Sequence, residues 1–237
     1  MSDSDHYYDA RNMGGLQHQF HTPRYVIPYL PKNKDAFILD IGCGVGNFVG
    51  DCVVTHGRIN VKGIDISDDA VNYARSINLP VEKIESIASF AKASAEKYDF
   101  ILMSHVLEHL DKKTIVDTLR IIKDELLQDD GVLFIAVPNA QSSTHAYWAY
   151  EDFTHTLLFT TGSLMYVMKS SGFQHYEFVD LDAFIGETAW NACFRRILLS
   201  AYKAMKLFER YITRSYYHQQ SPISFAYELK LVGYKKR

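Results

Sequence analysis

The chain has 237 residues, of which 47% are apolar, and its formal net charge at pH 7 is −3. This length suits one domain with an elaboration, and the near-neutral charge excludes a general nucleic-acid binder. Three scattered cysteines, Cys43, Cys52 and Cys193, argue against a disulfide framework and against a zinc site.

The first 35 residues predict a helical lead-in that is interrupted by Pro23, Pro28 and Pro31. The amino terminus is acidic and polar and lacks the basic and apolar regions of a signal peptide. No apolar run reaches the roughly 18 residues that a membrane-spanning helix needs. We therefore expect a cytoplasmic protein.

Strand and helix patterns alternate along the rest of the chain. Strands are predicted at 36–41, 60–64, 80–84, 98–103, 131–137, 173–181 and 222–235. Helices are predicted at 47–55, 67–77, 110–127, 160–171 and 187–214, with a brief helix or loop at 90–96. This alternation predicts an α/β, doubly wound, mostly parallel sheet, whose last two strands could supply an antiparallel edge. The core domain is expected at 36–181, and 182–237 are expected to add a helix and the closing strand.

A glycine-rich loop follows the first predicted strand. The sequence Ile-Leu-Asp-Ile-Gly-Cys-Gly-Val-Gly-Asn-Phe-Val at 38–49 lacks the third glycine of a dinucleotide-binding loop and has no basic residue for a pyrophosphate. Asp40 would repel phosphate but suits an ammonium group. Asp65 ends the second predicted strand, where a carboxylate can hold ribose hydroxyls. A nucleoside with an amino-acid end and no phosphate, such as S-adenosylmethionine (SAM), fits these features.

Four motifs together resemble class I SAM-dependent methyltransferases: residues 38–49, 63–65, 98–110 and 131–139, within a region of about 36–181. The resemblance implies a Rossmann-like seven-stranded fold with SAM as the cofactor. It implies cofactor contacts at Asp40, Gly42, Cys43, Gly44, Gly46, Asp65, Ile66, Ser86, Ile87 and Ser104. Ser86 departs from the acidic residue usual at the adenine edge, and Cys43 also fits a small packing residue. Ser104 and His105 are expected to face the methyl group.

The segment after the fourth strand carries His105, Glu108 and His109, whose spacing places all three on one helix face. In ubiquinone-type O-methyltransferases this segment can contribute to a metal site, and two imidazoles with a carboxylate could bind a divalent ion. The alternative is that Glu108 and His109 are structural. We predict no metal at this site.

An aromatic segment at 147–160 follows the fifth strand, at the edge of the sheet where ligands of such folds bind. Its rings and acids suit a polyhydroxylated acceptor. His155 is the candidate general base, with Asp152 positioning or polarising it, and His105 is a further catalytic candidate. The alternative makes His155 a structural cap or an orienter of the loop.

The pattern of Asp152, His155, Phe159 and Gly172 resembles a branch of methyltransferases associated with bacterial surface-polysaccharide and glycan assembly. This resemblance implies O-methylation of a sugar hydroxyl in a glycan or its precursor. Two alternatives stay open: a small-molecule O- or N-methyltransferase for a quinone-like or amine substrate, and a SAM-binding scaffold without catalysis.

The predicted helix at 187–214 is amphipathic and basic. Residues 190–214 hold six basic residues and one acidic residue, a net charge of +5, which leaves −8 on the rest of the chain. The helix could pack on the sheet with a solvated basic face, cover the substrate, contact the inner face of a membrane peripherally, or form a homodimer face.

Overall fold

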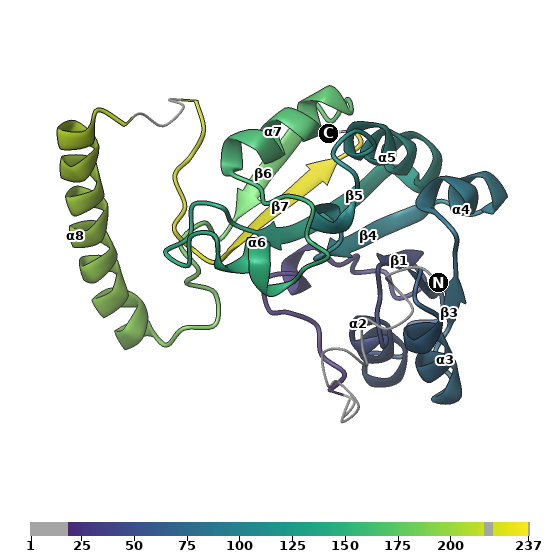
Figure 1. The fold of residues 1–237 in the computed structure, drawn as a ribbon. Coiled ribbons are helices and arrows are strands. Elements are labelled where there is room, and N and C mark those ends of the chain that lie inside the picture. Colours follow the sequence, from purple (N-terminus) through teal and green to yellow (C-terminus); the bar gives the residue numbers. More distant parts are fainter. Residues whose placement is uncertain (1–18, 216–219, 237) are drawn as a thin grey trace.

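The computed structural model describes residues 19–215 and 220–236, and these form one seven-stranded sheet with helices on both faces (Figure 1). The strands are β1 (Ile38–Ile41), β2 (Val61–Asp65), β3 (Val81–Lys83), β4 (Tyr98–Ser104), β5 (Leu127–Pro138), β6 (His175–Val179) and β7 (Glu228–Tyr234). Their order is β3-β2-β1-β4-β5-β7-β6, and β7 is antiparallel to both of its neighbours. The predicted doubly wound sheet with an antiparallel element near its edge is confirmed.

The central strands β4 and β5 each contain a long apolar run, because both faces of the sheet are covered. In β4, Ile101 and Met103 join one hydrophobic core, while Phe100 and Leu102 join the other. Alternate residues of a strand point to opposite faces, so a strand between two helical layers reads as a continuous apolar run. This explains why the predicted strand types were right.

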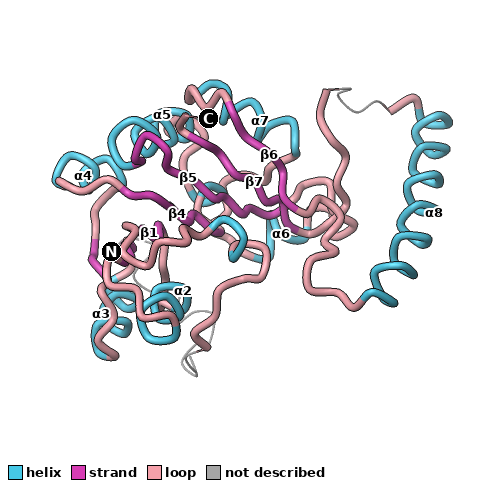
Figure 2. The backbone as a smooth tube through the Cα atoms, turned by 180° about the vertical axis from the view of Figure 1, so that it is seen from behind, coloured by secondary structure: helices cyan, strands magenta, loops and turns pink. Residues whose placement is uncertain are grey.

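The helices are α2 (Asn47–Gly50), α3 (Asp68–Ser76), α4 (Ile87–Ala93), α5 (Ile115–Ile121), α6 (Tyr147–Glu151), α7 (Thr161–Ser170) and α8 (Ala189–Thr213). Side chains of α4, α5 and α7 contribute to one core, and those of α2 and α3 contribute to the other. Figure 2 shows the same two helical layers from behind.

Several predicted boundaries differ from the observed ones. The strand predicted at 222–235 begins only at Glu228, and the one predicted at 131–137 begins already at Leu127. The helix expected at 110–127 begins only at Ile115, because the Asp111 carboxylate accepts from the Lys113 N–H and forms a turn before it. The helix expected at 90–96 begins at Ile87, because Ser86 and Ser89 form a reciprocal cap. The loop after β5 contains α6.

The predicted amino-terminal helical lead-in falls largely on residues outside the described ones. From residue 19 onward the segment has turns and one short 3₁₀ helix, Ile27–Tyr29. No described helix is long and apolar enough to cross a membrane.

The chain reverses its direction of winding between β1 and β4, which are neighbours in the sheet. In an open α/β sheet the ligand crevice lies outside the carboxyl ends of the strands at this switch. The glycine loop after β1 and His105 after β4 both lie there. The helix α8 stands apart from the sheet, on the side of α6 and of the amino-terminal end of β7 (Figure 1).

Candidate active site

The glycine loop brings its backbone close to its neighbours. Gly42 has φ +71°, and a Cβ there would lie 2.3 Å from Cγ2 of Val106. At Gly46, φ is +83° and a Cβ would lie 2.6 Å from Cδ1 of Leu79. Only glycine fits both positions. Both glycines therefore allow close packing, Gly46 against Leu79 at the start of α2 and Gly42 against Val106.

Two carboxylates lie at the ends of β1 and β2. Asp65 accepts hydrogen bonds from the Gly44 N–H (2.8 Å) and the Ser67 N–H (2.8 Å), so it ties the glycine loop to the start of α3. Asp40 is 5% exposed. Its burial, and then the charge of Asp65, raise the pKa of Asp40 well above the usual range. A cationic group between these acids would offset both effects, as the ammonium of SAM would.

This arrangement predicts that SAM affinity rises with pH. The ligand ammonium favours ionised Asp40, and the raised pKa keeps this carboxyl protonated to a higher pH than usual. Affinity measured by calorimetry should therefore increase as pH rises through the Asp40 pKa and level off above it. Asp40→Asn should remove this pH dependence and weaken binding. If SAM affinity rose equally with pH in wild type and in Asp40→Asn, the proposed ammonium contact would be contradicted.

Other predicted cofactor residues divide into accessible and buried ones. Ile66 follows Asp65 and is 53% exposed, so its side chain is accessible to a ligand. Ser86 caps α4 through its hydroxyl, and Ile87 packs partly against the core. Cys43 is 8% exposed, and its sulfur would lie 2.7 Å from a Cβ at Gly63. The Cys43 side chain is thus a packing group, and only its backbone could serve a ligand.

His105 lies between two glutamate carboxylates, which favour its protonated form. Its Nδ1 donates to Glu108 Oε1 (3.2 Å) and its Nε2 donates to Glu228 Oε1 (2.8 Å). Burial lowers the His105 pKa, but the hydrogen bonds and charges of the two glutamates outweigh it and raise the pKa to about 10. The neighbouring Ser104 ends β4 and is half-buried. A protonated ring paired with two carboxylates is poorly suited to accept a proton, so the geometry favours a charge-pairing role for His105 over the predicted catalytic one.

A cavity of about 160 Å³ opens next to this cluster. Its walls are His105, His109, Pro138, Trp148, Asp152, His155 and Tyr227. The indole N–H of Trp148 is buried and finds no acceptor among the described residues. A buried donor of this kind is costly unless a ligand satisfies it.

His155 has a defined tautomer. Its Nδ1 lies 2.5 Å from the carbonyl oxygen of Trp148, which can only accept, so Nδ1 carries the proton. Nε2 is then the basic nitrogen of the neutral ring, and it lies 3.8 Å from Asp152 Oδ2. The His155 side chain is 6% exposed. This geometry combines the two predicted roles, because the same ring that orients the loop presents a basic nitrogen.

A hydrogen-bond chain fixes the neighbouring His109. The Thr154 hydroxyl donates to Asp152 Oδ1 (2.6 Å), so it accepts from His109 Nδ1 (2.9 Å). Burial lowers the His109 pKa, which keeps this ring neutral. The rings of His109 and His155 meet edge to face with centroids 4.7 Å apart. Asp152 thus acts on both histidines, one through Thr154 and the other directly.

The side chains that converge as potential metal ligands in the structure differ from the three that the sequence suggested. Ligand atoms of Glu108, His109 and His155 lie within 4.8 Å of one another, whereas His105 binds the two glutamates instead. Glu108 is buried, and its Oε2 has no hydrogen-bond partner among the described residues. Two imidazoles whose other nitrogens are oriented by hydrogen bonds, with one carboxylate, fit a divalent ion such as Zn²⁺.

Two contributors to this site were missed in the sequence. Glu228 and Tyr227 come from the start of β7, more than 100 residues after His105. Glu228 is 2% exposed. The sequence does carry a signal for Glu228, because Glu228 and Lys230 stand in an otherwise apolar strand. Buried charges occur mainly where they are paired, so these two residues indicate a paired site. The salt bridge from Lys230 Nζ to Glu228 Oε2 is 3.5 Å long.

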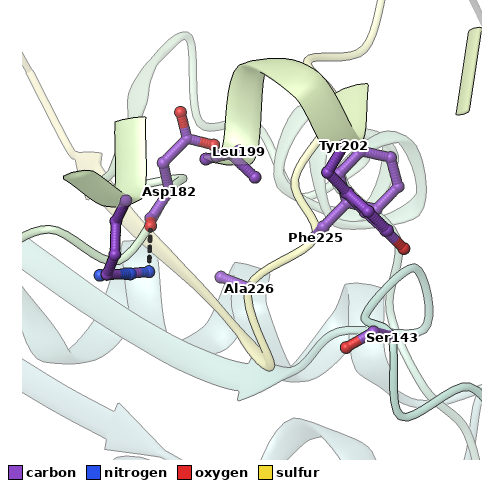
Figure 3. A pocket seen from close by; sticks show the side chains of 7 residues that line it. Ser143, Asp182, Leu199, Tyr202, Phe225 and Ala226 are labelled. Carbon is purple, nitrogen blue, oxygen red and sulfur yellow. Dashed lines mark hydrogen bonds between the residues drawn. The ribbon is translucent and has the colours of Figure 1, made fainter. Parts of the chain in front are cut away.

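A second cavity of about 250 Å³ lies between α8 and the loops beneath it (Figure 3). It is lined by Ser143, Asp182, Arg195, Leu199, Tyr202, Phe225 and Ala226. Ala226 is bonded in sequence to Tyr227 of the first cavity, so one backbone segment borders both.

Comparison with known proteins agrees with this geometry. A family model described as a methyltransferase domain matches residues 16–177. Ajmaline N-methyltransferase of Rauvolfia serpentina is 34% identical over 92 residues, which are 35% of this chain and 30% of that protein. A ubiquinone biosynthesis O-methyltransferase of Hydrogenovibrio crunogenus is 28% identical over 110 residues, 44% of this chain and 45% of that protein. The chain thus spans less than half the length of these curated relatives.

Solved structures share the fold. A SAM-dependent methyltransferase from Archaeoglobus fulgidus superposes with a TM-score of 0.65 at 19% identity, covering 97% of this chain and 100% of that one. The plantazolicin methyltransferase BpumL, solved with SAH, has a TM-score of 0.54 at 19% identity, covering 90% of this chain and 80% of that one. The match over residues 16–177, together with the glycine loop and the sheet, shows that the chain belongs to the methyltransferase domain family. Its cofactor is SAM.

Proposed function

We propose that the protein transfers the methyl group of SAM to a sugar hydroxyl of a glycan or glycan precursor, with His155 as the general base. The observation that carries the proposal is the fixed tautomer of His155, which places a basic nitrogen at a small cavity beside the expected methyl position. A hydroxyl is a weak nucleophile until its proton is removed, so such a base has a clear task.

The residues divide this task between them. SAM supplies an activated methyl group on a sulfonium when bound. Asp40 and Asp65 would hold its amino-acid and ribose parts, and Ile66 would pack on the adenine. His155 would take the acceptor proton while the cavity walls hold the acceptor oxygen in line with the methyl carbon. The cationic His105 would remain a fixed charge that orders Glu108 and Glu228.

The lining of the cavity supports a polyhydroxylated acceptor. Trp148 and Tyr227 offer ring faces, Asp152 offers a carboxylate, and the indole N–H offers a donor that needs an oxygen. The adjoining cavity at Ala226 would admit a further unit of a longer acceptor. The curated relatives act, by their names, on ajmaline and in ubiquinone biosynthesis, and they support the alternative of a small amine or quinone-like acceptor.

Methyl transfer from labelled SAM to a panel of acceptors tests the proposal. The panel should hold free sugars, nucleotide sugars, lipid-linked sugars, a catechol and an aromatic amine. We expect turnover with one of the sugar classes and none with the catechol or the amine. Turnover with the catechol or the amine alone would refute the sugar acceptor and support the small-molecule alternative. SAM binding without any turnover would favour a scaffold without catalysis.

A second candidate uses a divalent ion at Glu108, His109 and His155, because their ligand atoms converge and Glu108 Oε2 is orphaned. The ion would lower the pKa of a bound hydroxyl. Our prediction of a metal-free site expects full activity after treatment with EDTA and desalting. Loss of activity that Zn²⁺, Mn²⁺ or Mg²⁺ restores would establish the ion instead.

A further inference from the structure

The helix α8 presents its charged side to the rest of the protein and its apolar side to solvent. On the inner side, Arg195 donates to the carbonyl oxygens of Asp182 (3.2 Å) and Ala183 (2.6 Å), and Lys203 binds the Asp182 carboxylate (2.8 and 2.9 Å). The Tyr202 ring also packs there, edge to face on Phe225. An amphipathic helix of a globular protein normally has the opposite orientation.

The outward side of α8 carries a continuous apolar stripe. It consists of Trp190, Phe194, Ile197, Met205, Phe208 and Ile212, which are between 55% and 81% exposed. We call these six side chains the α8 stripe. An exposed apolar surface of this length, along a helix of 25 residues, marks a site of interaction.

The α8 stripe is symmetric about the middle of the helix. Its centre is Ala201, and large apolar residues stand at equal distances on either side. Ile197 matches Met205, Phe194 matches Phe208, and Trp190 matches Ile212, at offsets of 4, 7 and 11 residues from Ala201. In an antiparallel pair of identical helices, a two-fold axis at the centre places each residue opposite its counterpart. The stripe is therefore complementary to a second copy of itself, as an isologous interface requires.

The surface that two α8 stripes would bury against each other is large enough for a specific dimer. If each side chain contributes roughly 100 Å², about half of what a large residue buries in full, twelve side chains from two copies bury roughly 1,200 Å², the lower end for a specific interface. Ala201 at the crossing point is small enough to let the two helices approach closely.

The charges on α8 do not favour a lipid surface. Arg195 pairs with Glu187 (2.9 Å), Lys203 with Asp182 and Lys206 with Glu209 (2.7 Å), so half of the six cations within 190–214 are already neutralised. A lipid surface would also not require an arrangement that is symmetric about the middle of the helix. We propose that α8 is a dimerisation helix, on which the α8 stripes of two copies pack antiparallel about an axis at Ala201.

This dimer would also act on the second cavity. Arg195, Leu199 and Tyr202 of α8 line that cavity (Figure 3). Packing α8 against a second copy would fix this wall in place.

Sedimentation of the purified protein tests the proposal with two variants. Wild type should sediment as a dimer at micromolar concentration, and Ile197→Glu should sediment as a monomer with at least a 100-fold weaker association. Ile59→Glu is the matched control, since Ile59 is 75% exposed and lies outside α8. It should remain dimeric. A monomeric wild type, with or without binding to anionic vesicles, or a dimeric Ile197→Glu, would overturn the proposal.

Cross-linking tests the axis itself. In a Cys193→Ser background only the buried Cys43 and Cys52 remain. Ala201→Cys should then form an intermolecular disulfide under mild oxidation. Thr213→Cys should not, because its symmetry mate would lie roughly 36 Å away at 1.5 Å per residue. Equal cross-linking by both variants would refute antiparallel pairing about Ala201.

Discussion

Replacing Asp65 by alanine is expected to weaken SAM binding by about 100-fold or more. Two hydrogen bonds from a carboxylate to ribose hydroxyls are worth roughly 1.5 kcal/mol or more each, and 1.4 kcal/mol corresponds to a factor of ten. The variant also loses the bonds from the Gly44 and Ser67 N–H groups that shape the glycine loop. Isothermal titration calorimetry with SAM and SAH measures the effect directly.

Asp69→Ala is the matched control, because Asp69 is an exposed carboxylate in the first turn of α3, close to Asp65 in sequence. It should bind SAM as wild type does. Asp65→Asn separates the two roles of Asp65, since an amide keeps one acceptor for the loop but loses the charge. Unchanged SAM affinity in Asp65→Ala, with the fold intact by circular dichroism, would show that the ribose is held elsewhere.

Replacing His155 by glutamine is expected to lower kcat by about 100- to 10,000-fold, the range that general-base catalysis supplies. Glutamine fits the volume and can still donate to the Trp148 carbonyl oxygen, but it has no basic nitrogen. SAM affinity should stay within about twofold of wild type, because His155 lies in the acceptor cavity and outside the glycine loop.

His175→Gln serves as the control, since His175 is an exposed histidine of β6 far from the cavity in sequence and fold. Its kcat should equal that of wild type. A His155→Gln variant with nearly full turnover would mean that proximity alone suffices. Because His155 is also a possible metal ligand, the same assay is repeated after EDTA treatment, where only the ion-dependent alternative predicts a loss in wild type.

Local sequence determined the order and type of the elements. Apolar runs predicted β1, β4 and β5, because a strand covered on both faces has no polar side. The helices predicted at 67–77 and 160–171 begin at Asp68 and Thr161, and Ser67 and Thr160 cap them through their hydroxyls. The glycine loop and Asp65 predicted the cofactor because their chemistry is contained in two short segments.

The acceptor side of the site depended on tertiary structure. The sequence favours His155 as the general base and gives His105 as a further catalytic candidate. The fold decides between them by placing Glu228 of β7 on one ring and the Trp148 carbonyl oxygen on the other. The pKa of a histidine depends on its charged partners, and Glu228 lies 123 residues after His105, so the raised pKa of His105 could not be predicted from its own segment.

The amphipathic pattern of α8 was evident in the sequence, but its orientation was not. Periodicity defines an apolar stripe and a charged stripe without saying which of them faces the body. The ion pair of Lys203 with Asp182 and the packing of Tyr202 on Phe225 turn the polar side inward. The sequence by itself determined the fold class, the cofactor loop and the helix pattern, since these are local. Only the tertiary structure decided that Glu228 pairs with His105 and which side of α8 meets solvent, since both depend on contacts between segments far apart in the chain.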